Sequence, residues 1–212
     1  NPSGTTYALC RTSNGTSCAS GGYVQADGSL GSSAAWQTRG SWGGATGVTV
    51  TGLSANTSYQ FLAQARNGDS TTAALSSAST ALYTVANAPG TPTLSEAKTN
   101  GVTLTIDANS NPSTTEYSIQ ETLQSKYVKA DLTLGDSAVW QTSTTWGTIA
   151  ITGLSGGTLH TFTVTARNGD NITTSASSTA SLSTLSGGSS RPRGGDEGGG
   201  DRTTGGGDTS TG

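Results

Sequence analysis

Apolar and polar side chains alternate over several short stretches of the chain. In the segment 159–167, the side chains at 160, 162, 164 and 166 share one side of an extended strand, and threonines occupy three of the positions between them. The segment 59–65 alternates in the same way, with aromatic residues and alanines on one side. A period of two predicts half-buried β-strands in both segments. Further strands are expected at 102–106, 116–120, 138–141, 149–152 and 179–184.

Both of these strands end in the same five residues, ARNGD, at 65–69 and again at 166–170. An Arg, a Gly and an Asp so close together suggest a recognition loop. An Asn-Gly pair directly after a strand is, however, the dipeptide that best tolerates the positive φ angles of a tight hairpin turn. The alternation points both arginines outward, so we interpret the motif as hairpin chemistry and leave open whether the arginines contact a neighbouring module or chain. The two turns comprise Arg66, Asn67, Gly68 and Asp69 in the first copy and Arg167, Asn168, Gly169 and Asp170 in the second.

The repeated pentapeptide belongs to a longer internal repeat. "NPSGTTYAL" at Asn1 is echoed by "NPSTTEYSI" at Asn111, and "TGLSANTSYQFLAQARNGD" by "TGLSGGTLHTFTVTARNGD". The offset between the copies falls from about 110 to about 101 residues, so the first copy carries extra residues, mainly in one loop. Self-similarity of this length predicts two tandem all-β units at 1–86 and 87–186, followed by a Gly-rich flexible tail at 187–212.

Composition narrows the class of protein. Charged residues make up 11% of the chain and methionine is absent, so hydroxyl side chains must fill most solvent-facing positions, as is typical of β-rich surfaces. The formal net charge is −3, and no basic patch with interleaved aromatic residues is present. Nucleic acid is therefore not an expected partner. No apolar run in the sequence is long enough to span a bilayer.

The two cysteines lie eight residues apart, at Cys10 and Cys18, within the longer loop of the first copy. Their spacing suits a disulfide across the base of a hairpin loop, although a reduced pair is the alternative. Two cysteines are too few for a zinc site, and the only histidine, His160, is far away in sequence. A disulfide would place the chain in an oxidising compartment, and we expect an extracellular or cell-surface location.

Read in order, the connector "VANAPGTP", "NPSTTEYSI", "TGLSGGTLHTFTVTARNGD" and a final Ser/Thr-rich strand resemble a fibronectin type III module. The resemblance implies a seven-stranded antiparallel β-sandwich in which the ARNGD turn joins the last two strands. The hydroxyl-rich style is similar to modules of microbial secreted or surface proteins. Tyr59 stands where the family places its tyrosine corner, whereas the second copy has His160 there. We interpret His160 as a structural histidine, with a ligand or a pH switch as the alternatives.

The first copy departs from this family pattern because it begins in the middle of a module. It lacks the two strands that "PTLSEAKTNGVTLTID", at 92–107, supplies to the second copy. A sandwich without these strands would have an open edge and a bare core face. We expect either upstream sequence or strand addition from another chain to complete it. The tail is a poor donor because it has no apolar residue that could fill a core.

No catalytic constellation, metal-ligand pattern or cofactor motif is found, and we predict that the chain is not an enzyme. The sequons at Asn14, Asn56 and Asn171 fall in predicted loops, where they are either possible glycosylation sites or chance occurrences. The paired tryptophans either fill the cores or form ligand or interface surfaces. They are Trp36 and Trp42 in the first copy, and Trp140 and Trp146 in the second.

These features favour a non-catalytic structural or adhesive protein, a surface or filament building block. It would associate with itself or with other surface proteins, and the incomplete first module would allow self-assembly by β-strand complementation. The alternative is a carbohydrate-binding or spacer region of a secreted polysaccharide-degrading enzyme, in which the tryptophans would stack on sugar rings.

Overall fold

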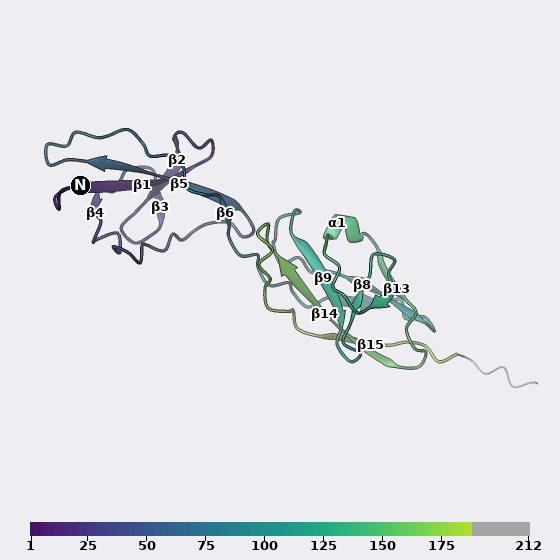
Figure 1. The fold of residues 1–212 in the computed structure, drawn as a ribbon. Helices are drawn as coiled ribbons and strands as arrows, with labels where there is room; N and C mark the ends of the chain where they lie inside the picture. Colours follow the sequence, from purple (N-terminus) through teal and green to yellow (C-terminus); the bar gives the residue numbers. More distant parts are fainter. Residues whose placement is uncertain (188–212) are drawn as a thin grey trace, which may run out of the picture.

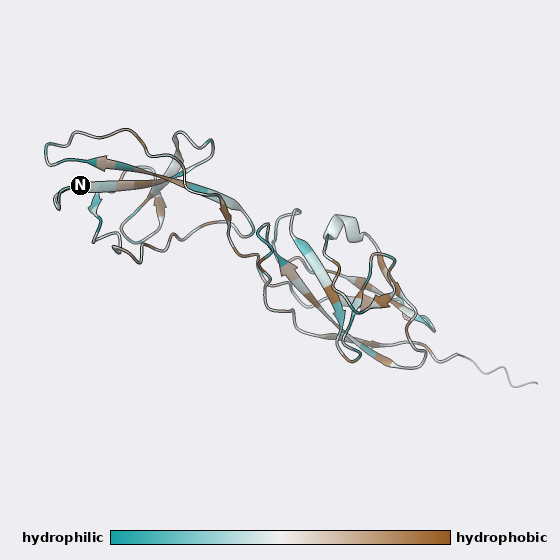
Figure 2. Ribbon diagram, viewed as in Figure 1, coloured by the Kyte–Doolittle hydropathy of each residue, from teal (hydrophilic) through white to brown (hydrophobic). Residues whose placement is uncertain are grey.

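The computed structural model describes residues 1–187, so the predicted tail lies almost wholly outside the described residues. The described chain is nearly all β, and its strands pair in antiparallel fashion in two modules that lie end to end (Figure 1). We call residues 1–86 the first module and residues 87–186 the second. Hydrophobic segments alternate with pale and hydrophilic ones along the strands of both (Figure 2).

The second module is a β-sandwich of two sheets. The smaller sheet has the order β13-β8-β7 and the larger the order β11-β10-β9-β14-β15, with β12 pairing beside β9. This is the strand arrangement of a fibronectin type III-like sandwich. The strands are β7 (Thr93–Ser95), β8 (Gly101–Thr105), β9 (Glu116–Glu121), β10 (Lys126–Val128), β11 (Leu134–Gly135), β12 (Gln141–Thr142), β13 (Ile149–Thr152), β14 (Leu159–Arg167) and β15 (Ala180–Ser183).

The core of the second module lies between its two sheets. His160, Phe162, Val164 and Ala166 on β14 are all 0% exposed, as the alternation in the sequence predicts. Strands β8 and β13 cover them from the other sheet, because Ile149 of β13 and its neighbours belong to the same cluster of buried side chains. Both sheets therefore contribute one apolar face to a closed core.

The first module consists of a single sheet with the order β3-β2-β1-β5-β6, to which β4 adds beside β1. Its central pair, β1 and β5, is aligned from Thr6 opposite Arg66 to Thr12 opposite Gln60. Within residues 1–86, no strand corresponds to β7, β8 or β13 of the second module. The strands are β1 (Thr6–Thr12), β2 (Cys18–Val24), β3 (Leu30–Gly31), β4 (Gln37–Thr38), β5 (Ser58–Arg66) and β6 (Leu82–Tyr83).

The strand predicted at 138–141 is wrong in its extent. Only Gln141 and Thr142 pair with β9, and the chain then turns into the short helix α1 (Ser143–Trp146). The Thr142 side chain caps this helix by accepting a hydrogen bond from the amide of Thr145. The helical turn carries Trp146 into the core, where it is 5% exposed.

The predicted geometry of the ARNGD turns is also wrong in one respect. Positive φ angles occur at Ser70 and Asn171, after the Asn-Gly pairs and not within them. The asparagine acts instead through its side chain, because Oδ1 of Asn67 accepts a hydrogen bond from the amide of Thr71 at 2.8 Å. The motif therefore still ends the strand, but as a turn closed by an asparagine side chain.

Candidate interaction sites

The inner face of the first sheet is only half covered. Tyr7 and Leu9 on β1 are half-buried, whereas Tyr117 and Ile119 at the aligned positions of β9 are 1% and 0% exposed. The residue types hardly differ between the copies, so the difference in exposure comes from the strands that pack on this face. In the second module, β8 and β13 lie there.

The segment 48–50 shows the same difference at the edge of this face. Val48 and Val50 are half-buried, whereas the aligned residues of β13, Ile149 and Ile151, are 2% and 1% exposed. Strand β13 pairs with β8 from Ile149 opposite Leu104 to Thr152 opposite Gly101. The segment 48–50 has no strand partner within residues 1–187 and forms no β-strand. We call Tyr7, Leu9, Val48 and Val50 the open face of the first module.

A cavity of about 270 Å³ opens on this face and is lined by Tyr7, Leu9, Arg39, Trp42 and Gly44. The indole of Trp42 is 5% exposed and donates a hydrogen bond from Nε1 to the Tyr7 carbonyl oxygen at 2.8 Å. Trp146 makes the equivalent bond to Tyr117 in the second module at 3.0 Å. Both tryptophans therefore anchor a loop to a central strand, whether or not the face is closed.

The other two tryptophans lie among the arginines of the ARNGD motifs. The guanidinium of Arg66 lies 4.4 Å from the centre of the Trp36 ring, and that of Arg167 lies 4.8 Å from the Trp140 ring. Both rings are half-buried. The sequence offered a choice between core and surface for all four tryptophans, and the structure divides them into two core and two stacked residues. Each outward-pointing arginine therefore stacks on a tryptophan of its own module, a contact that the repeat alone did not predict.

The second ARNGD turn forms much of the joint between the modules. Nδ2 of Asn168 donates to the carbonyl oxygens of Tyr83 and Thr84 at 3.3 and 3.1 Å. The carboxylate of Asp170 accepts a hydrogen bond from the amide of Tyr83 at 2.7 Å. A Cβ at Gly169 would lie 2.5 Å from Cζ of Tyr83, so the tyrosine ring packs directly on the glycine.

Asn56 completes the joint from the side of the first module. Its Oδ1 accepts a hydrogen bond from the amide of Gly169 at 2.9 Å, and its Nδ2 donates to Thr115 Oγ1 at 2.8 Å. Asn56 is 4% exposed, so the prediction that it lies in an exposed loop is wrong. A glycan on its Nδ2 would have no room beside the second module in this joint. Asn14 and Asn171 are exposed.

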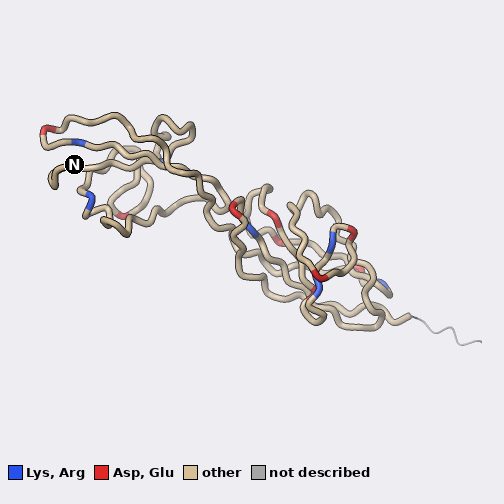
Figure 3. Tube along the Cα trace, viewed as in Figure 1, with Lys and Arg blue, Asp and Glu red and all other residues tan. Residues whose placement is uncertain are grey.

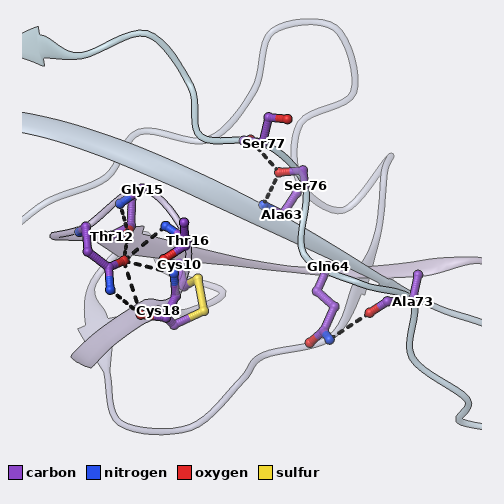
Figure 4. The surroundings of a disulfide bond; sticks show 12 residues. Cys10, Thr12, Gly15, Thr16, Cys18, Ala63, Gln64, Ala73, Ser76 and Ser77 are labelled. Atoms are coloured by element: carbon purple, nitrogen blue, oxygen red, sulfur yellow. Dashed lines mark hydrogen bonds between the residues drawn. A yellow bond between two sulfur atoms is a disulfide. The ribbon is translucent and has the colours of Figure 1, made fainter.

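The predicted disulfide joins Cys10 on β1 to Cys18 on β2 (Figure 4). The loop between them is ordered by side chains that accept backbone hydrogen bonds. Oδ1 of Asn14 accepts from the amides of Thr16 and Ser17, each at 3.0 Å. The insertion that distinguishes the first copy is thus closed covalently at its base.

A buried ionisable pair in the second module has a different counterpart in the first. Glu121 and His160 are both 0% exposed, with 3.5 Å between Oε1 and Nδ1. Nε2 of His160 lies 3.2 Å from the Ser155 carbonyl oxygen, to which it donates. At the aligned positions, Arg11 lies 5.9 Å from the ring centre of Tyr59. His160 is thus surrounded by buried groups of its own module.

Charged residues are sparse and scattered over both modules (Figure 3). Among residues 1–187, no group of three or more His, Cys, Asp or Glu side chains could hold a metal ion. No helix in the part of the chain that the structure describes is long and apolar enough to cross a membrane.

No family model and no curated protein matches the chain. Among solved structures, it is similar to a two-domain fibronectin type III segment of chicken tenascin, with 12% identity, a TM-score of 0.44 and 84% of each chain covered. The FN1–FN3 domains of chicken CNTN1 are 12% identical with a TM-score of 0.36, and 86% of this chain covers 54% of that one. The central fibronectin-III array of RIM-binding protein is 14% identical with a TM-score of 0.34, and 86% of this chain covers 57% of it.

The chain thus spans about half of the CNTN1 structure that it matches. All three structures are fibronectin type III segments. Since the identities and TM-scores are low, the assignment of the fold is carried by the sheet order of the second module, β13-β8-β7 against β11-β10-β9-β14-β15.

Proposed function

We propose that this chain is a structural or adhesive building block of the cell surface or of an extracellular assembly. In this proposal the open face of the first module accepts β-strands from another polypeptide segment. A fibronectin type III-like fold is consistent with a non-catalytic structural or adhesive role. The extracellular setting is supported by the Cys10–Cys18 disulfide, since such bonds persist in oxidising compartments.

The observation that carries the proposal is the comparison of the two copies at the same four positions. Each of these side chains is half-buried in the first module and at most 2% exposed in the second. There β8 lies beside Ile149 and Ile151 in the same sheet, and its Val102 and Leu104 share the buried core with Tyr117 and Ile119 of the other sheet. An apolar sheet face with an unpaired edge is a surface on which an extended segment adds.

The energy available at this face is modest, because the four side chains are already largely buried. Completing the burial of each contributes about 0.5 kcal/mol, which amounts to roughly 2 kcal/mol for the four. The backbone hydrogen bonds formed along 48–50 would add to this, and the ordering of the incoming strands would offset part of it. The occupant should therefore be a strand with apolar residues at alternate positions, as in the sequence of β8.

The direct experiment uses the strand pair of the second module as a probe. A synthetic peptide of residues 92–107 is titrated into the isotope-labelled full chain, and amide chemical shifts are followed by NMR. We expect saturable shifts at Tyr7, Leu9 and 48–50, with no change in β9. Docking of Val102 and Leu104 into the face is the physical reason.

The matched control is the same peptide with Val102→Ser and Leu104→Ser, which keeps the backbone and removes the apolar side chains. Its binding should be at least tenfold weaker, because two buried aliphatic side chains are lost. Equal shifts with both peptides, or none with either at millimolar concentration, would contradict the proposal that this face accepts strands.

A further inference from the structure

Five residues of the second module contact either the end of the first module or Asn87, the residue that directly follows it. Thr115, Asn168, Gly169 and Asp170 bond to or pack on Asn56, Tyr83 and Thr84, as described above. The fifth is Asn111, whose side chain exchanges two hydrogen bonds with the backbone of Asn87. Its Oδ1 accepts from the Asn87 amide at 2.7 Å, and its Nδ2 donates to the Asn87 carbonyl oxygen at 2.8 Å.

The same five residue types stand at the aligned positions of the first module. "NPSGTT" aligns with "NPSTTE", and each copy has ARNGD, which gives Asn1, Thr5, Asn67, Gly68 and Asp69. We call these five residues the end face of the first module. Figure 1 places the N-terminus at the end of the first module that points away from the second. The end face thus lies opposite the joint.

This end face lacks the neighbours that its counterpart has. A Cβ at Gly68 would meet nothing within 4 Å, whereas one at Gly169 would collide with the Tyr83 ring. A cavity of about 460 Å³ lies over the face, and its lining includes Asn1, Thr5, Asn67 and Gly68. Among the described residues, Nδ2 of Asn67 has no hydrogen-bond acceptor, although Oδ1 of the same side chain closes the turn.

We propose that the end face of the first module is a docking site for the C-terminal end of a further β-sandwich module. That module would carry an asparagine at the position of Asn56 and a tyrosine at the position of Tyr83. Its asparagine accepts a hydrogen bond from the Gly68 amide, its tyrosine ring packs on Gly68, and Nδ2 of Asn67 donates to its last-strand carbonyl oxygens. The proposal concerns the end of the sandwich, so it goes beyond strand addition at the open face.

The C-terminal end of the second module is a poor occupant. In "TGLSGGT" the residue aligned with Asn56 is Gly157, which has no side-chain amide. The residue aligned with Tyr83 is Ser183, which has no ring to pack on the glycine, although Thr184 matches Thr84. A second copy of this chain therefore does not offer the required end from its second module. The partner is a module of the first type.

The experiment supplies such an end within one polypeptide. In an extended chain, a second copy of residues 1–110 is fused in front of residues 1–212. The leading Asn56 and Tyr83 are then joined to the next end face through the same connecting segment, 84–110, as in the native joint. The extended chain contains two copies of Gly68, one in the leading module and one in the middle module. The leading copy is the internal control, since nothing precedes it.

We expect amide hydrogen exchange at Gly68 of the middle module to be about tenfold slower than at the leading copy, because one hydrogen bond is gained there. Asn56→Ala in the leading module should remove this difference, and Gly68→Ala in the middle module should loosen the new joint. In the native chain, Gly68→Ala should leave the unfolding midpoint unchanged, whereas Gly169→Ala should lower it.

Equal exchange at both copies of Gly68 would overturn the proposal. So would slowing of Gly68 exchange in the native chain that grows with protein concentration, because the occupant would then be a second copy. Exchange at 48–50 of the middle module reports separately on strand addition by the leading 92–107 segment. Protection at 48–50 without protection at Gly68 refutes only the docking site and leaves strand addition standing. Protection at Gly68 without protection at 48–50 supports the docking site and refutes strand addition at the open face.

Discussion

Positions 121 and 160 show how one pair of sites changes character between the copies. Glu121 accepts hydrogen bonds from the amides of Gln124 and Thr161, at 2.7 and 3.2 Å, as well as facing His160. The first module has Arg11 and Tyr59 at these positions, both half-buried. A buried carboxylate with three neighbours of this kind is tolerated only while those neighbours remain in place.

We therefore expect Glu121→Gln to destabilise the second module by about 3 kcal/mol or more. The side-chain NH₂ group of the glutamine would replace one carboxylate oxygen, so that it would face a backbone N–H that needs an acceptor. The matched change in the first module, Arg11→Gln, should cost less than about 1 kcal/mol, since only a partly exposed cation–π contact is lost. Urea unfolding of both variants measures this. Equal losses would show that burial of the pair has no energetic consequence.

Asp131 offers a prediction of pH dependence. Hydrogen bonds from the Thr133 side chain and amide, together with Lys129, lower the pKa of Asp131 from its ordinary value of 3.8 to about 2. Because the folded-state pKa is the lower one, the stabilisation is fully present above pH 3.8 and is lost as the pH falls towards 2. Carboxyl shifts in an NMR titration should give this pKa, and Thr133→Ala should raise it. A value near 3.8 in the unsubstituted chain would contradict the predicted interaction.

Some residue roles could not be read from the sequence because identical residues have different neighbours. Asn168 and Asn67 stand in the same five-residue motif, yet only Asn168 meets another module. Asn56 lies in a sequon that reads as an exposed loop, and its burial is a consequence of the joint alone. The signal that could have revealed it is the contrast between the copies. Gly157 stands at the position of Asn56 in the second module, and no module follows that end within residues 1–187.

At the scale of strands and turns, local patterns were sufficient where the core is closed. The alternation in β14 predicted its buried face correctly because β8 and β13 complete the sandwich above it. The same alternation in β5 predicted a buried face that is only half-buried, and the residue that is 1% exposed there, Leu62, lies on the other side. Periodicity reports which residues share a face, but burial depends on strands elsewhere in the sequence.

The Cys10–Cys18 disulfide should stabilise the first module selectively. Replacing both residues with alanine removes the constraint on a loop of about nine residues, which costs about 2–3 kcal/mol. The unfolding transition of the first module should move to lower urea concentration, while that of the second stays in place. Native-state exchange in β2 and β14 assigns the two transitions. An equal shift of both would mean that the modules unfold as one unit.

In the whole molecule, the two copies of the repeated unit differ in which of their surfaces are covered. The second module has its core covered by β8 and β13 and its end face covered by the first module. The first module has equivalents of both surfaces, and neither is covered by residues 1–187. The repeat in the sequence predicts two units, and residues 1–86 contain no strands equivalent to β7 and β8, as it also predicts. It could not predict the joint, because that depends on which unit precedes which.

The measurement that tests the open face most directly is amide hydrogen exchange in the purified chain, compared between 48–50 and 149–151. These segments are aligned copies, and only the second is paired with a strand, β8. We expect 48–50 to exchange at least a hundredfold faster, at nearly the rate of an unfolded peptide, because 149–151 is protected by the closed core. Protection of 48–50 equal to that of 149–151 would show that the first module has no open face.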